Sequence, residues 1–195
     1  MNLKKYLGEG VLIVFSVLFA LFINKTSEEA KTKRDRNNAI EQIKTEFSDN
    51  KKILGIWMAN HNAVLENLNN LIEQKNDSIQ ILAKNKGFLP IQIILDNKNL
   101  VDQPLSNSAW SSAQSIGIIS EFDFKTLQHI SETYKLQQLI MDSSIEKIAE
   151  RLILKSNDVG NTRAILLEFR LRFQNLLGQE YRLSDLYQET IKILK

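Results

Sequence analysis

Glu9 is the side chain in this sequence with the strongest claim to chemistry, because it lies at the entry of a long apolar run. A carboxylate at the edge of a membrane-spanning segment is either held at the interface or takes part in function. In the first turn of a helix, the carboxylate would interact favourably with the positive end of the helix dipole and would reach lipid headgroups. The alternative is a contact with a basic or polar group of another membrane protein, in which Ser16 and Ala20, four residues apart, would pack closely.

The two histidines, His61 and His129, do not form a metal-binding motif. Neither has another histidine at ligand spacing and the chain has no cysteine, so a zinc site would need carboxylates from distant positions. His61 instead falls on the heptad pattern described below, where a polar side chain can set the register of packed helices. We predict a structural role for it and no metal ligands.

Two further groups of residues have a structural and a functional interpretation. Trp57 and Trp110 each lie on a periodic apolar face, which favours core packing over a platform for a ligand. Four arginines near the C-terminus could bind an anionic partner or lipid headgroups: Arg163, Arg170, Arg172 and Arg182. The interleaved Glu168 and Glu180 favour a solvated charged face instead.

No motif for catalysis or for a cofactor is present. The glycines occur singly and form no phosphate-binding loop or nucleophile elbow, and no paired His-Glu motif occurs. The formal net charge of +2, with 25% charged residues, indicates neither nucleic acid nor an acidic substrate as partner. We therefore predict no catalytic residues, no cofactor and no nucleic-acid partner.

The apolar run predicts one transmembrane helix within residues 1–24. Val11 to Ile23 is interrupted only by Ser16, and with Tyr6 to Gly10 it forms a helix of about 18 residues, roughly 27 Å long and close to the thickness of a bilayer core. A cleaved signal peptide is the rival interpretation, since Lys4 and Lys5 form a basic start. The bulky residues that end the run disfavour cleavage. We predict a single-pass protein of a bacterial inner membrane, with the lipid bilayer as its first partner.

The side of the membrane that holds the C-terminal domain stays open. Lys4 and Lys5 precede the apolar run, and five basic residues follow it: Lys25, Lys31, Lys33, Arg34 and Arg36. This count favours a cytoplasmic domain, but long domains often cross the membrane regardless of charge.

Two stretches resemble a family of uncharacterised Bacteroidota proteins with one N-terminal transmembrane helix and a helical domain of unknown function. The first has Gly8-Glu9 before the apolar run and Ala20-Leu21-Phe22-Ile23-Asn24 at its end, and the second extends from Trp110 to Tyr134. Where that family continues with Asn-Trp-Asn-Glu, this chain has Lys25-Thr26-Ser27-Glu28, so only the glutamate matches. The resemblance implies an anchored helical protein and no particular activity.

After a charged juxtamembrane stalk at 25–39, a heptad pattern begins at Ile40 and continues for six heptads. Its a positions are Ile40, Phe47, Leu54, His61, Leu68, Lys75 and Leu82. Its d positions are Ile43, Asn50, Trp57, Val64, Leu71 and Ser78. A second apolar row at Leu65, Ile72 and Ile79 indicates a helix that packs against two neighbours rather than a simple two-stranded coiled coil.

Turn residues divide the remaining chain. A loop is expected at 83–107, containing a helical turn or short strand at Ile91–Leu95, followed by a helix from Ser108 that stops at Gly117. A capping box at Ser120 and Asp123 predicts the start of a long second helix that extends to about Leu152. Residues 157–161 predict a turn, then a third helix that ends near Gly178 and a terminal segment at 186–194 started by Ser184.

The sum is an all-α fold: a transmembrane helix that continues into a long amphipathic helix, packed in an antiparallel helical bundle of residues 40–195. Its predicted packing anchors are Phe47, Leu54, Trp57, Leu68 and Trp110. The function predicted is that of a membrane-anchored interaction or scaffold protein without catalysis, either an accessory subunit of an envelope complex or a homo-oligomer. A ligand-sensing bundle that signals through a partner is the alternative, and a membrane-bound enzyme with carboxylates from distant helices is a third.

Overall fold

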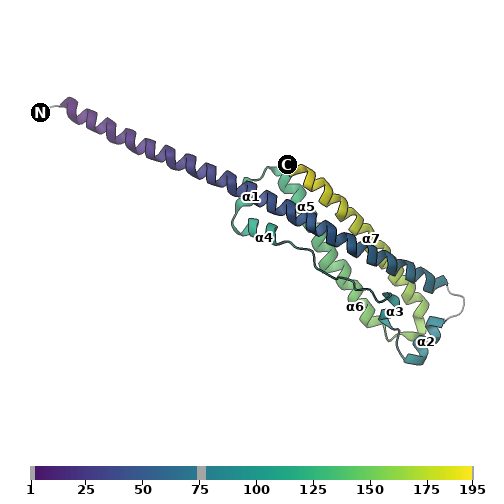
Figure 1. The fold of residues 1–195 in the computed structure, drawn as a ribbon. Coiled ribbons are helices and arrows are strands. Elements are labelled where there is room, and N and C mark those ends of the chain that lie inside the picture. Colours follow the sequence, from purple (N-terminus) through teal and green to yellow (C-terminus); the bar gives the residue numbers. More distant parts are fainter. Residues whose placement is uncertain (1–2, 74–77, 195) are drawn as a thin grey trace.

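The computed structural model describes residues 3–73 and 78–194 of the chain (Figure 1). Every regular element in these ranges is a helix, which confirms the all-α prediction. Three long helical segments form a bundle, and a fourth stretch of short helices and extended chain connects the first segment to the second.

The first helix, α1 (Leu3–Glu73), has 71 residues and would be roughly 105 Å long at the usual helical rise. Its N-terminal part projects away from the bundle (Figure 1). The large apolar side chains from Val11 to Ile23 are 51–66% exposed, because no other part of the described chain covers them. This segment is long and apolar enough to span a membrane, as the sequence predicts.

The second segment is almost continuously helical. This segment consists of α5 (Phe124–Leu139), a π-helical turn η2 (Ile140–Ile145) and α6 (Glu146–Lys155), and the third segment returns beside it. After the 3₁₀ turn η3 (Val159–Asn161), α7 (Thr162–Ile193) runs antiparallel to both other segments and packs along α1 and α5. The segment α5–α6 runs in the same direction as α1, because the intervening chain first returns to the start of the bundle.

The buried face of α1 has the predicted spacing of three and four residues. Its members are at most 1% exposed: Ile43, Phe47, Asn50, Leu54, Trp57, His61, Val64 and Leu68. This face of α1 packs mainly on α7, and Phe47 also contacts Tyr134 of the second segment. The heptads were predicted to continue to Leu82 in one helix, but α1 is described only to Glu73, and Ser78 and Leu82 belong to a separate helix, α2 (Ser78–Lys86). Lys75 lies outside the described residues.

The connection from α2 to α5, called the crossover from here on, lies along α1. It contains α3 (Ile91–Ile94), extended chain, α4 (Ser108–Ser115) and the 3₁₀ turn η1 (Ile118–Glu121). As predicted, α4 ends before Gly117, whose φ of +74° is the left-handed conformation that glycine adopts without strain. The predicted turn at Ile91–Leu95 is helical.

Two predicted helix boundaries are wrong. The cap of α5 is Asp123, whose carboxylate accepts a hydrogen bond from the Thr126 amide, while Ser120 lies inside η1 and bonds to the Gly117 carbonyl instead. Helix α7 passes through Gly178 and continues to Ile193, so the two predicted C-terminal helices are one. The reason is that the buried stripe of α7 continues without a change of phase on both sides of Gly178, and packing overrides the low helix propensity of a single glycine.

Replacement of Gly178 by alanine tests this continuity. No atom lies within 4 Å of the position that a Cβ would take, so Gly178→Ala should stabilise the protein by about 0.5–1 kcal/mol. The matched variant Gly117→Ala should destabilise it by about 1–2 kcal/mol, because its φ is positive. Urea unfolding of the full chain in detergent measures both. A destabilising Gly178→Ala would mean that the helix ends there.

Candidate functional site

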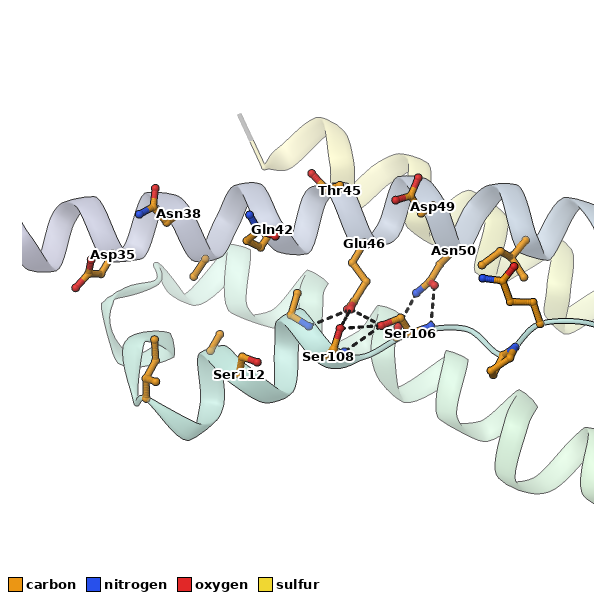
Figure 2. A pocket seen from close by; sticks show the side chains of 17 residues that line it. Asp35, Asn38, Gln42, Thr45, Glu46, Asp49, Asn50, Ser106, Ser108 and Ser112 are labelled. Atoms are coloured by element: carbon orange, nitrogen blue, oxygen red, sulfur yellow. Dashed lines mark hydrogen bonds between the residues drawn. The ribbon is translucent and has the colours of Figure 1, made fainter.

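A groove between α1 and α4 has a volume of about 650 Å³ (Figure 2). It lies at the end of the bundle from which α1 continues toward the apolar segment. Carboxylates, amides and hydroxyls line one part of it: Asp35, Asn38, Gln42, Thr45, Glu46, Asp49, Asn50, Gln103, Ser106, Ser108 and Ser112. Small and apolar residues line the other: Ala39, Ile53, Pro104, Ala109, Ala113 and Ile116.

Glu46 is the most heavily bonded residue of the groove. One carboxylate oxygen accepts hydrogen bonds from the hydroxyls of Ser106 (2.6 Å) and Ser108 (2.8 Å) and from the amide of Ala109 (2.9 Å), as Figure 2 shows. The other oxygen accepts a hydrogen bond from the Tyr134 hydroxyl. The N-cap residue of α4, Asn107, makes no side-chain cap, so Glu46 of α1 supplies the acceptor that the first turn of α4 requires.

This bonding keeps Glu46 ionised. Burial by itself would raise the pKa of the carboxyl, but the hydrogen bonds from Ser106, Tyr134, Ala109 and Ser108 together outweigh it and lower the pKa below the ordinary value. For Tyr134, which donates to Glu46, burial and the neighbouring Glu46 charge raise the pKa of the hydroxyl, so the hydroxyl stays protonated and remains a donor. The site is therefore a fixed negative charge surrounded by donors.

Beside Glu46, the amide of Asn50 pairs with the backbone of the crossover. Asn50 donates to the Ser106 carbonyl (2.7 Å) and accepts from the Ser106 amide (2.8 Å). Gln137 of α5 donates to the same carbonyl (2.9 Å) and accepts from the Tyr187 hydroxyl of α7 (2.6 Å). One short stretch of crossover is thereby joined to all three long helical segments.

The hydrogen bonds within the groove limit what Glu46 itself can do chemically. Both oxygens of Glu46 already accept hydrogen bonds, so this carboxylate is not a free general base. Asp35 and Asp49 also line the groove, and the Asp49 carboxylate is paired with the exposed ammonium group of Lys52 (2.8 Å). In the part of the chain that the structure describes, no three His, Asp or Glu side chains are grouped so as to hold a metal ion. The lining suits polar or positively charged groups of a binding partner.

A second polar cluster lies inside the core. His61 of α1 and Glu180 of α7 are both fully buried, and the imidazole Nδ1 lies 2.7 Å from a Glu180 carboxyl oxygen. The imidazole Nε2 lies 2.9 Å from the carbonyl oxygen of Leu100 in the crossover. Because that carbonyl can only accept, Nε2 carries a proton, and a second proton lies between Nδ1 and the carboxyl. The pair is thus neutral overall, and the other oxygen of Glu180 has no hydrogen-bond partner.

The predicted membrane contact residues are brought onto one face of the anchor. Ser16 and Ala20 lie seven and eleven residues after Glu9, which is close to two and three turns of α1. All three are exposed in the described chain, and the Ser16 hydroxyl bonds to the Leu12 carbonyl (2.8 Å).

The predicted packing anchors lie in the bundle. Phe47, Leu54, Trp57 and Leu68 are at most 1% exposed, and the Trp57 indole donates to the Gln103 carbonyl (3.2 Å). Trp110 is half-buried and stacks on Tyr134, with 5.6 Å between ring centroids.

The sequence predicts a role for neither of the two central carboxylates, Glu46 and Glu180. The prediction of a solvated charged face that includes Glu180 is wrong, because Glu180 is fully buried. A signal for it existed, since Phe173, Leu176, Glu180, Leu183 and Tyr187 follow one 3,4 stripe, which the predicted helix end at Gly178 interrupted. Of the interleaved residues, Glu168 does pair at the surface, with Arg151 (2.9 Å) and Arg172 (2.8 Å). For Glu46 no local signal exists, because its donors lie 60 to 88 residues away in the sequence.

No family model, no curated protein and no solved structure matches this chain.

Removal of the Glu46 charge should destabilise the fold in a pH-dependent way. The folded pKa is lowered, so the stability that the carboxylate contributes is present above its unfolded value of 4.5 and is lost as the pH falls through the folded value. Glu46→Gln should cost about 1–3 kcal/mol at pH 7, because several donors lose an ionised acceptor. The exposed Glu41→Gln is the matched control on α1. In urea unfolding, the free energy of unfolding should fall below the wild-type value for Glu46→Gln alone. This difference in free energy should become smaller in acid.

Replacement of His61 and Glu180 singly and together tests the buried pair. His61→Leu alone leaves Glu180 without its partner and should cost about 3–5 kcal/mol, whereas His61→Leu with Glu180→Leu should come much closer to wild-type stability. Urea unfolding of the three variants gives the coupling between the two positions. Additive losses would contradict a direct pairing.

Proposed function

We propose that this chain is a single-pass membrane-anchored interaction protein, whose helical bundle associates with itself or with another envelope protein as an accessory or scaffold subunit without catalysis of its own. The observation that supports this most directly is the continuity of α1, which carries the exposed apolar segment at one end and the buried seam of the bundle at the other. A bundle attached by a continuous helix has its distance and direction from the anchor set by that helix.

The groove between α1 and α4 supports the same proposal. It combines hydrogen-bonding groups, carboxylates and small apolar residues on an open surface, which is the composition expected where a polar partner segment docks. The fixed charge of Glu46 and the carboxylate of Asp35 favour a partner with basic or donor groups.

We infer a bacterial inner membrane as the location, from the apolar N-terminal helix and the composition of the chain. The resemblance of residues 8–24 and 110–134 to anchored Bacteroidota proteins agrees with it and is part of the proposal. Which side of the membrane holds the bundle decides between periplasmic scaffolding and a regulatory role in the cytoplasm, and a reporter fused after Lys195 would report that side.

Purification of the full chain in mild detergent tests the proposal. We expect a homo-oligomer or a complex with a stoichiometric partner, identified by light scattering and cross-linking. Ser112→Trp, which fills the groove, should weaken the association several-fold, and Ser115→Trp, an exposed position of α4 outside the groove, should not. A monodisperse monomer that captures no protein would contradict the proposal and favour the ligand-sensing alternative.

A further inference from the structure

The end of the bundle that faces the anchor carries the most exposed apolar side chains of the described residues. Phe124, the first residue of α5, is 81% exposed, and Ile116, at the C-cap of α4, is 71% exposed. Both values exceed those of every large apolar side chain in the anchor itself, the highest of which is 66% at Leu12. Exposed apolar residues of this size are unfavourable in water unless another surface covers them.

The position of these two residues follows from the fold. They flank η1, which packs against α1 where Thr32, Asp35 and Arg36 become partly buried. Nearer the apolar segment, Glu121 of η1 lines a hollow together with Lys25, which lies two residues after Ile23, the last apolar residue. The end of the bundle therefore reaches down along α1 to the level at which the chain would leave the membrane.

The distance to the bilayer is short. Thr32 lies eight residues beyond Asn24, or about 12 Å along a helix, and the headgroup layer occupies about 5–8 Å of that on each side of a bilayer. Transmembrane helices tilt by about 20°, which lowers a group about 10 Å from the helix axis by roughly 3 Å. The remaining gap is no more than the reach of a large side chain.

The charges around this end match a lipid surface. Basic residues outnumber acidic ones in the segment that separates bundle and anchor. The basic residues are Lys25, Lys31, Lys33, Arg34 and Arg36, and the acidic ones are Glu28, Glu29 and Asp35. On the bundle itself, Lys125 follows Phe124 directly, while Asp123 precedes it and caps α5 and Glu121 lies in η1, so the excess of basic residues belongs to the juxtamembrane part of α1. Apolar side chains that enter the interface beside basic residues are the combination that binds peripheral segments to anionic membranes.

We propose that the η1 end of the bundle, with Phe124 and Ile116, docks on the surface of the membrane that holds the anchor and binds anionic lipid headgroups through the basic juxtamembrane residues. The occupant of this surface is the lipid bilayer. The inference rests on the proposed function in one respect, namely that α1 is inserted as a membrane anchor. Docking would hold the bundle tilted against the bilayer and would fix the face that it presents to a partner.

Site-directed spin labelling tests the docking, because the chain has no cysteine and any introduced cysteine is labelled alone. The full chain is reconstituted into vesicles of phosphatidylcholine and phosphatidylglycerol with a nitroxide at Phe124→Cys or Ile116→Cys. The control Ile153→Cys lies on α6 near the far end of the bundle and is similarly exposed, at 67%. Val17→Cys reports on the anchor. Collision rates with oxygen, which concentrates in lipid, and with a water-soluble nickel chelate are compared.

We expect the labels at positions 116 and 124 to collide with the chelate several-fold less often than the label at 153, and the difference to decrease in vesicles of phosphatidylcholine alone. Labels at 116 and 124 that are as open to the chelate as the label at 153 would overturn the docking. Dipolar broadening between copies at position 124, which does not line the groove, would overturn it as well, because it indicates a second chain on this surface. A lipid-exposed label at 17 in either case leaves the anchor intact. A water-exposed label at 17 contradicts the anchor and the docking together.

Discussion

The fold depends on one requirement: the backbone of the crossover lies against the bundle in a largely extended form, and its polar groups need partners that it cannot supply itself. Helices satisfy their own amides and carbonyls, but an extended segment beside them does not. A series of side chains along α1 supplies these hydrogen-bond partners. Asn67 donates to the carbonyls of Ile93 and Ile94, His61 to Leu100, Trp57 to Gln103 and Asn50 to Ser106, and Glu46 accepts from the start of α4.

These polar residues explain the unusual members of the heptad pattern. Glu46, Asn50, Trp57 and His61 are spaced by four, seven and four residues, so they lie on one face of α1 beside the apolar seam. Asn50 and His61 therefore do set a register, as the sequence predicts for polar residues at a and d positions, but it is the register of the crossover against α1. From Glu46 to Asn67 the helix rises about 30 Å, which the twelve residues from Ile94 to Ser106 cover at roughly 2.6 Å each. A shift of the crossover by one residue would break most of these bonds at once.

The parts of the fold that the sequence predicts are those that depend on local periodicity. Hydropathy identifies the anchor, the 3,4 spacing identifies the buried face of α1, and the glycine of positive φ marks the end of α4. The site is not predictable in the same way, because Glu46 meets donors from α4 and α5, and Glu180 meets His61 across 119 positions. The sequence around a charged residue does not tell whether that residue lies on the surface or is bonded to partners far away in the chain. The error at Gly178 is of a second kind, since glycine both ends helices and is tolerated inside them when the stripe on either side continues to pack.

The continuity of α1 has a mechanical consequence for any function that involves the membrane. Sharp kinks in helices occur at proline, at glycine or serine pairs, or at π turns, and α1 has no proline and no glycine between Gly10 and Gly55. The junction between anchor and bundle therefore bends only gently. Residues 35–53 of this same helix form one wall of the groove, and its buried face from Ile43 to Leu68 packs on α7. A partner that binds the groove preferentially at one tilt of α1 must shift the tilt of the anchor, and a change in the anchor must alter the affinity of the groove by the same factor, because the coupling of two sites is reciprocal. If the proposed function holds, a partner site at the base of this unbroken helix would also be a site through which the membrane acts on the partner.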